Sequence, residues 1–255
     1  MFDCMLDVCR GSGDVECSVC YRAEGAHLRI SYTATSTART PVSLTNHAYF
    51  NLSAGADATV FGHTLQLACD AFAPDDGSGD GLPTGAFVSV EGTPRDLRED
   101  GKSLEQIIQD QARLSPHWPH GEEFVVTANR GVDCNAVAAA SEHSLPPFAA
   151  KLSHPPSGRC LHVYTSEPAL QVSMHVYRGI ISLIDNGSFH PQTYYSTLLA
   201  DTGHVMKNGS SYGAHAGICL ETQRHANAES ASAPTRLLPK GDVYRQETVL
   251  VFSVK

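Results

Sequence analysis

Two short stretches of the sequence carry side chains suited to acid–base chemistry. The first is TNHAYFN at residues 45–51, where His47 and Tyr49 share one face if the segment is extended. Histidine exchanges protons near neutral pH, and an aromatic ring can pack on the C–H surface of a sugar. The second is GICLETQ at residues 217–223, where an apolar run ends at Glu221. Partial burial raises the pKa of a carboxyl group, which suits a general base.

Both stretches also have ordinary structural interpretations. For His47 the alternative is a hydrogen-bonded histidine at the end of a strand, and for Glu221 it is a surface carboxylate. The residue types alone leave an acid–base site and a structural role both open.

Other groups of metal-ligating residue types have unsuitable spacings. Cys17 and Cys20 form a CxxC pair, but they fall on opposite faces of a strand. The acidic loop at residues 75–81 would place Phe87 where a calcium loop needs a bidentate glutamate. The sequence also contains no HExxH or phosphate-binding-loop motif. We therefore expect no metal site.

Composition narrows the class of protein. The chain has 255 residues, is 42% hydrophobic and 18% charged, and has a formal net charge of -9, which is typical of a globular domain and argues against a nucleic-acid partner. No apolar run approaches the roughly 20 residues that a membrane-spanning helix needs. The first ten residues do not resemble a secretory signal, so we expect a cytoplasmic protein whose eight cysteines are free thiols.

The elements that must hold these side chains are mostly short strands. Alternating residues predict a hairpin of residues 15–21 and 28–32, joined by a turn at Glu24 and Gly25. One helix is predicted over residues 104–114, with a capping box made by Ser103 and Gln106. Further strands are expected near residues 64–67, 87–90, 124–127, 148–152, 161–165, 170–174, 218–221 and 248–254. Many strands with one helix predict an all-β fold, an antiparallel β-sandwich.

One domain is expected, because a sandwich of this size commonly forms a single core. We assign it residues 13–255 and expect residues 1–12 to be an irregular N-terminal segment. Residues 134–147 and 175–212 have mixed periodicity with Gly, Ser and Asn, which predicts long loops or insertions.

Longer motifs carry a family resemblance. The segment TPVSLTNHAYFNLSAG, residues 40–55, resembles TPVNLTNHSYFNLAG of aldose 1-epimerases, and GICLETQ resembles their GFCLETQ. Between them LPTG (82–85), GTPRDLR (92–98) and SGRCLHVYTSEPALQ (157–171) resemble IPTG, GTAFDLR and SGRVLEVYTTQPGVQ, in the same order. By these motifs the sequence is identified as a member of the aldose 1-epimerase (galactose mutarotase) family.

The resemblance implies a fold and a reaction. The fold is the large antiparallel sandwich, or supersandwich, of galactose mutarotases. The reaction interconverts the α and β anomers of free hexoses such as galactose and glucose, without a cofactor. Glu221 would take the proton of the anomeric hydroxyl, while His47 would protonate the ring oxygen. Substrate-binding roles are expected for Asn46, Tyr49, Glu122 and Gln223.

The sequence departs from the family pattern on its N-terminal side. Neither an FGRVANR-like arginine nor an LHGG-like histidine is found, so we expect a sandwich that is incomplete at the N-terminus. The family's GFDHNF-like aspartate falls on Gly121, and Glu122 is its expected replacement. A coding sequence cut short, a degenerate homologue and a homo-oligomer that supplies the missing surface all remain open.

Two other functions remain open at this point. One is a non-catalytic carbohydrate-binding or regulatory protein that keeps part of the pocket. The other is a hexose-6-phosphate mutarotase relative, which would need cationic side chains for the phosphate. The candidates for that role are Arg95, Arg98 and Arg224. In every case a small hexose is the expected partner, and neither a nucleic acid nor a membrane is.

Overall fold

The computed structural model describes residues 3–9, 13–74, 83–114, 122–129, 144–173, 209, 212–213, 215–225 and 237–255. Most of the two expected insertions, at residues 134–147 and 175–212, lies outside these ranges.

Most described residues form antiparallel strands, which confirms the predicted all-β class. The strands of the larger sheet are β1 Asp3–Cys9, β2 Asp14–Glu24, β3 His27–Ser36, β6 Thr64–Leu67, β9 Lys102–Ser103, β11 Phe148–His154, β12 Arg159–Thr165 and β16 Val243–Val254. Those of the smaller sheet are β5 Tyr49–Phe50, β7 Cys69–Ala73, β8 Val88–Ser89, β10 Glu122–Val126, β13 Ala169–Ser173 and β14 Ile218–Gln223. Two further short strands, β4 Thr40–Pro41 and β15 Leu237–Leu238, pair with each other.

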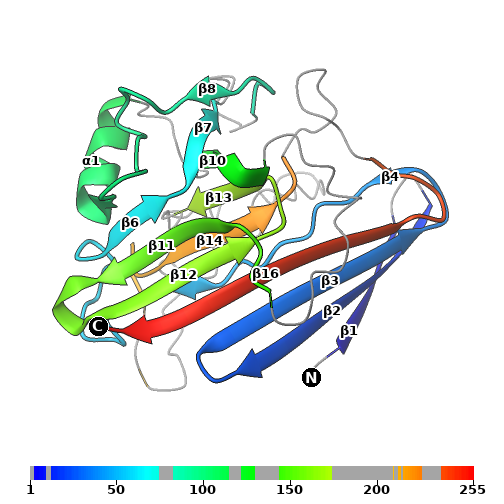
Figure 1. Ribbon diagram of the computed structural model, residues 1–255, viewed down its shortest axis with the longest axis horizontal. Coiled ribbons are helices and arrows are strands. Elements are labelled where there is room, and N and C mark those ends of the chain that lie inside the picture. The colour runs from blue at the N-terminus through cyan, green and yellow to red at the C-terminus, as the bar shows by residue number, and fades with distance from the viewer. Residues whose placement is uncertain are drawn as a thin grey trace, which may run out of the picture.

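The two sheets form the layers of a sandwich. Their strand orders are β1-β2-β3-β16-β12-β11-β6-β9 and β5-β14-β13-β10-β7-β8. In Figure 1, β11 and β12 lie in front of β14. One buried hydrophobic cluster joins the layers; it includes Ile30, Leu161 and Leu250 from the larger sheet and Phe124, Leu170 and Ile218 from the smaller one. Burying these alternate side chains is what holds the sheets face to face.

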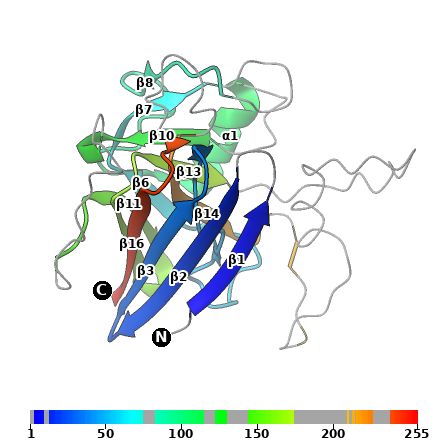
Figure 2. The ribbon, with the colours of Figure 1, turned by 90° about the vertical axis from the view of Figure 1, so that its right-hand side faces the viewer.

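The N-terminal hairpin is confirmed and extends further than expected. β2 pairs with β3 from Val15 to Glu24, and the turn closes at Gly25, whose φ of 57° favours glycine. The expectation of an irregular segment at residues 1–12 is wrong for Asp3–Cys9. That stretch forms β1, which pairs along β2 at the edge of the larger sheet (Figure 2). The outer edge of β2 offers unpaired backbone N–H and C=O groups. Pairing with these groups stabilises β1, which the local sequence pattern does not indicate.

The predicted helix is present as α1, Leu104–Leu114. The backbone N–H of Gln106 donates to Ser103 Oγ at 3.2 Å, so the serine caps the helix as expected. The Gln106 side chain instead donates to Asp110 Oδ1 at 2.8 Å, so it is not the second half of a capping box. No helix in the described ranges has the length and apolar composition needed to cross a membrane.

Candidate acid–base site

One face of the smaller sheet carries a row of polar side chains. Glu123, Gln171 and Glu221 lie directly opposite one another on β10, β13 and β14. Opposite residues in neighbouring strands project to the same face. Phe124 and Leu170, one position along, belong to the core between the sheets. The row therefore lies on the face of the smaller sheet that is turned away from the core.

The structure brings His47 to Glu221. β5 pairs with the start of β14, so that Tyr49 lies opposite Cys219 and His47 comes just before β5. His47 Nε2 lies 3.4 Å from Glu221 Oε1, and His47 Nδ1 lies 3.3 Å from Cys219 Sγ. The rings of His47 and Tyr49 are 5.1 Å apart between centroids. Three predicted site residues, His47, Tyr49 and Glu221, thus meet at one place.

Burial sets the protonation behaviour of this group. The Glu221 side chain is 10% exposed, whereas that of His47 is 39% exposed. Burial raises the pKa of Glu221 above its ordinary value, and the neighbouring His47 offsets part of that rise. Burial also raises the pKa of Tyr49 to about 12, with Cys219 and Glu221 adding to the rise. The arrangement thus places a strengthened carboxylate base beside a phenol that stays protonated at neutral pH.

Two other predicted binding residues, Asn46 and Gln223, lie close in sequence to His47 and Glu221. Asn46 donates from Nδ2 to Tyr21 Oη at 3.3 Å and accepts from the Ala48 backbone N–H at 3.1 Å, so it helps shape the segment that carries His47. Gln223 follows Glu221 by two positions on β14 and therefore shares its face. Their roles toward a substrate remain predictions.

Glu122 does not lie with Glu221, contrary to what its expected role requires. It is opposite Val172 and projects toward the core, where its buried carboxylate pairs with the partly exposed Arg95. The reason is the period of two along a strand, which sends neighbouring residues to opposite faces.

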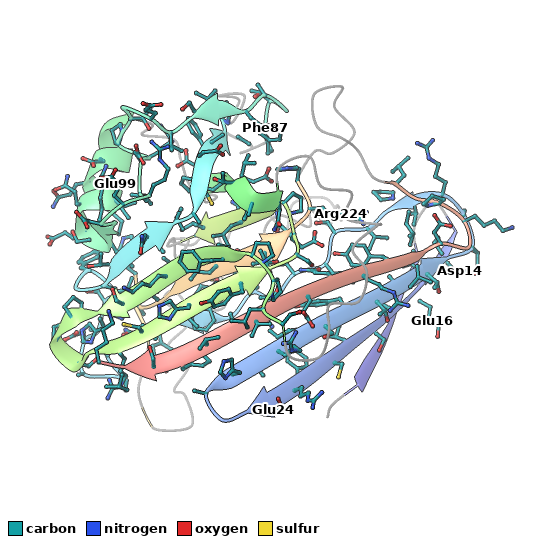
Figure 3. The ribbon with its side chains drawn as sticks, viewed as in Figure 1. Asp14, Glu16, Glu24, Phe87, Glu99 and Arg224 are labelled. Carbon is teal, nitrogen blue, oxygen red and sulfur yellow. The ribbon has the colours of Figure 1, made fainter. Side chains whose placement is uncertain are left out.

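Glu123 is the carboxylate of β10 on the site face, and sequence reasoning missed it. Its Oε1 lies 2.8 Å from His225 Nδ1, and both side chains are buried, at 2% and 9% exposure. The His225 ring is 4.6 Å from that of Phe87, which precedes β8 (Figure 3). A signal was available, because Glu123 has the opposite orientation to the apolar Phe124 in a period-two strand.

The three arginines considered for a phosphate have other partners. Arg95 pairs with Glu122, and Arg98 pairs with Asp96 at 2.7 Å. The guanidinium of Arg224 lies over the Tyr244 ring, 4.4 Å from its centroid. The structure therefore does not favour a phosphosugar site built from them.

A polar network supports β14 from the core side. Thr222 Oγ1 lies 2.6 Å from Thr248 Oγ1, and the Gln246 side chain donates to the Thr222 carbonyl at 2.9 Å. Tyr244 donates its hydroxyl to Gln246 Oε1 at 2.6 Å. These buried bonds hold the strand that carries Glu221, since buried polar groups that pair with one another restrict movement.

Known proteins resemble the chain over most of its length. The family model described as Aldose 1-epimerase matches residues 11–251. The galactose mutarotase of Sus scrofa is 32% identical over 243 residues, covering 95% of this chain and 58% of that protein. The aldose 1-epimerase of Escherichia coli is 38% identical over 165 residues, covering 62% of this chain and 41% of that protein.

A solved structure also resembles the chain in its fold. The crystal structure of a GalM/aldose epimerase homologue from C. elegans superposes with a TM-score of 0.67 at 26% identity, covering 95% of this chain and 61% of that one. The chain thus spans 58% of the length of the mammalian relatives it matches.

Proposed function

The chain belongs to the aldose 1-epimerase family, and we propose that it interconverts the α and β anomers of a free hexose at His47 and Glu221. One observation carries the proposal: His47 Nε2 and Glu221 Oε1 lie 3.4 Å apart, so a proton donor and a proton acceptor share one small volume. The relatives named galactose mutarotase support a hexose as the substrate class.

The reaction balances within this pair. Glu221 accepts the proton of the anomeric hydroxyl while His47 donates a proton to the ring oxygen, and the C1–O5 bond breaks to give the open-chain aldehyde. Rotation about C1–C2 then presents the other carbonyl face. On closure, Glu221 returns its proton to the carbonyl oxygen as the attacking hydroxyl gives its proton to His47. Both groups end in their starting states, and no redox step is involved.

Polarimetry of freshly dissolved α-D-galactose tests the proposal. The wild-type protein is expected to equilibrate the rotation faster than buffer does. His47→Asn is expected to lower the rate by about 10²–10⁴-fold, because asparagine cannot donate the proton to the ring oxygen. A wild-type rate equal to that of buffer would defeat the proposal, and calorimetric binding of the sugar in that case would support the carbohydrate-binding alternative.

We further propose that Glu123, rather than Glu122, binds hydroxyl groups of the sugar. One strand lies between β10 and β14, so Glu123 and Glu221 stand about two strand spacings, or ~10 Å, apart along the sheet. That separation suits a hexose whose anomeric carbon is at Glu221 and whose far hydroxyls reach Glu123.

The adjacent glutamates give a matched pair of variants. Glu123→Gln is expected to raise KM for galactose roughly tenfold, since a hydrogen bond to a charged group contributes about 1.5–3 kcal/mol. Glu122→Gln, the same change on the other face, is expected to leave KM unchanged. Initial rates over a range of galactose concentrations measure both. Equal KM values for the two variants would contradict the assignment.

A further inference from the structure

Three potential metal ligands, an imidazole, a thiol and a carboxylate, are found together at the site. Among the residues that the structure describes, His47, Cys219 and Glu221 each offer one ligand atom, and these atoms all lie within 4.8 Å of one another. Cys219 and Glu221 are two positions apart on β14 and share a face, while His47 approaches from the segment before β5. Sequence spacing does not reveal this group, because His47 and Cys219 are 172 positions apart.

We propose that Zn²⁺ binds reversibly to His47, Cys219 and Glu221 and inhibits the enzyme. Thiolate, imidazole and carboxylate are the ligand types that zinc takes in proteins, whereas Mg²⁺ and Ca²⁺ prefer sites made of oxygen atoms alone. Three protein ligands leave the fourth tetrahedral position for water. As the zinc–sulfur bond forms, the thiol of Cys219 releases its proton to solvent.

The three ligand atoms are close enough for a single ion to reach, since they all lie within 4.8 Å of one another. In a tetrahedral site the ligand atoms stand about 3.3–3.6 Å apart, from metal bonds of about 2.0–2.3 Å. In the structure Cys219 Sγ lies 3.3 Å from His47 Nδ1, and Glu221 Oε1 lies 3.4 Å from His47 Nε2, so the two partners contact different nitrogens of the ring. A metal uses only one imidazole nitrogen, so the ring must turn toward its two partners. His47 is the most exposed of the three residues, whereas Cys219 and Glu221 are buried and fixed on β14.

Inhibition is expected because two of the three zinc ligands are also the residues proposed to exchange protons. The inference rests on the proposed function, because His47 and Glu221 are its acid and base. An ion held by both removes the proton donor and the proton acceptor at once, so zinc acts here as an inhibitor and not as a cofactor.

Cobalt(II) provides a test that does not depend on activity. With Co²⁺ as the probe, the wild type is expected to bind one ion per chain with a thiolate-to-cobalt charge-transfer band that Zn²⁺ abolishes by displacement. Cys219→Ser is expected to lose that band and to weaken zinc inhibition at least ~10-fold. The matched control is Cys160→Ser, because Cys160 is equally a buried free cysteine but lies on β12 in the other sheet.

The outcomes separate the two proposals. A thiolate band that persists in Cys219→Ser, or one that is absent from the wild type, would overturn the zinc site. A band that depends on Cys219 in a protein without mutarotase activity would uphold the zinc site and reject the proposed function. Zinc inhibition that is as strong in Cys219→Ser as in the wild type would also count against the site.

Discussion

Glu221→Gln is expected to lower kcat for anomer interconversion by about 10²–10⁴-fold, because an amide cannot accept the proton of the anomeric hydroxyl. Glutamine has nearly the same shape as glutamate, so binding of the sugar should change much less than kcat. The measurement is polarimetry with α-D-galactose, together with a calorimetric titration of the sugar.

The pH dependence of the rate provides a second test of the role of Glu221. Burial raises the pKa of Glu221, and the base works only when it is ionised. The rate is therefore expected to fall as the pH drops through a value above the ~4.3 of an ordinary glutamate. Glu122→Gln, which changes a buried glutamate on the other face, should keep both the rate and this acid limb. Glu221→Gln with an unchanged acid limb would assign the titration to another group.

Glu167→Gln is expected to stabilise the fold above neutral pH. Glu167 is completely buried, and burial raises its pKa to about 7, although Arg224 and Tyr244 offset part of the rise. In the unfolded chain the pKa is about 4.3, so the unfolded state releases this proton at lower pH than the folded state does. The free energy of unfolding thus falls as the pH rises from ~4 through ~7.

The size of this effect follows from the two pKa values. Between pH 5 and pH 8 the wild type is expected to lose on the order of 2–3 kcal/mol more stability than Glu167→Gln does. Glutamine fits the position sterically, since the family segment SGRVLEVYTTQPGVQ carries it there. Urea unfolding of both proteins at the two pH values measures the difference.

The control for this prediction is Glu16→Gln, which removes an exposed carboxylate on β2 (Figure 3). It should lose as much stability as the wild type between the two pH values. Parallel behaviour of Glu167→Gln and the wild type would show that Glu167 is ionised in the folded state at both pH values, contrary to its burial.

Much of the fold was predictable from local pattern. Strands such as β6, β11 and β12 alternate in the sequence because one of their faces is buried, and α1 repeats its apolar residues at helical spacing. Among the strands longer than two residues, β1 and β7 are the ones that the sequence does not predict. A strand forms where a neighbouring strand offers hydrogen bonds, and that neighbour is not visible in a short window of sequence.

The candidate site was predictable in part. The motifs around His47 and Glu221 singled out both residues, and the structure places them in contact. Glu122 was preferred to Glu123 because the alignment of motifs carries no information about the face to which each side chain projects. A shift of one residue reverses that face.

The sequence by itself thus determined the all-β class, the family and the two residues proposed to exchange protons, because long motifs and period-two patterns are local properties of the chain. Only the tertiary structure decided that Glu123 shares the face of Glu221, that Cys219 reaches His47, and that Glu167 lies in the core. Each of these depends on pairing between distant strands, and the free energy that selects such pairing comes from burial of the whole core.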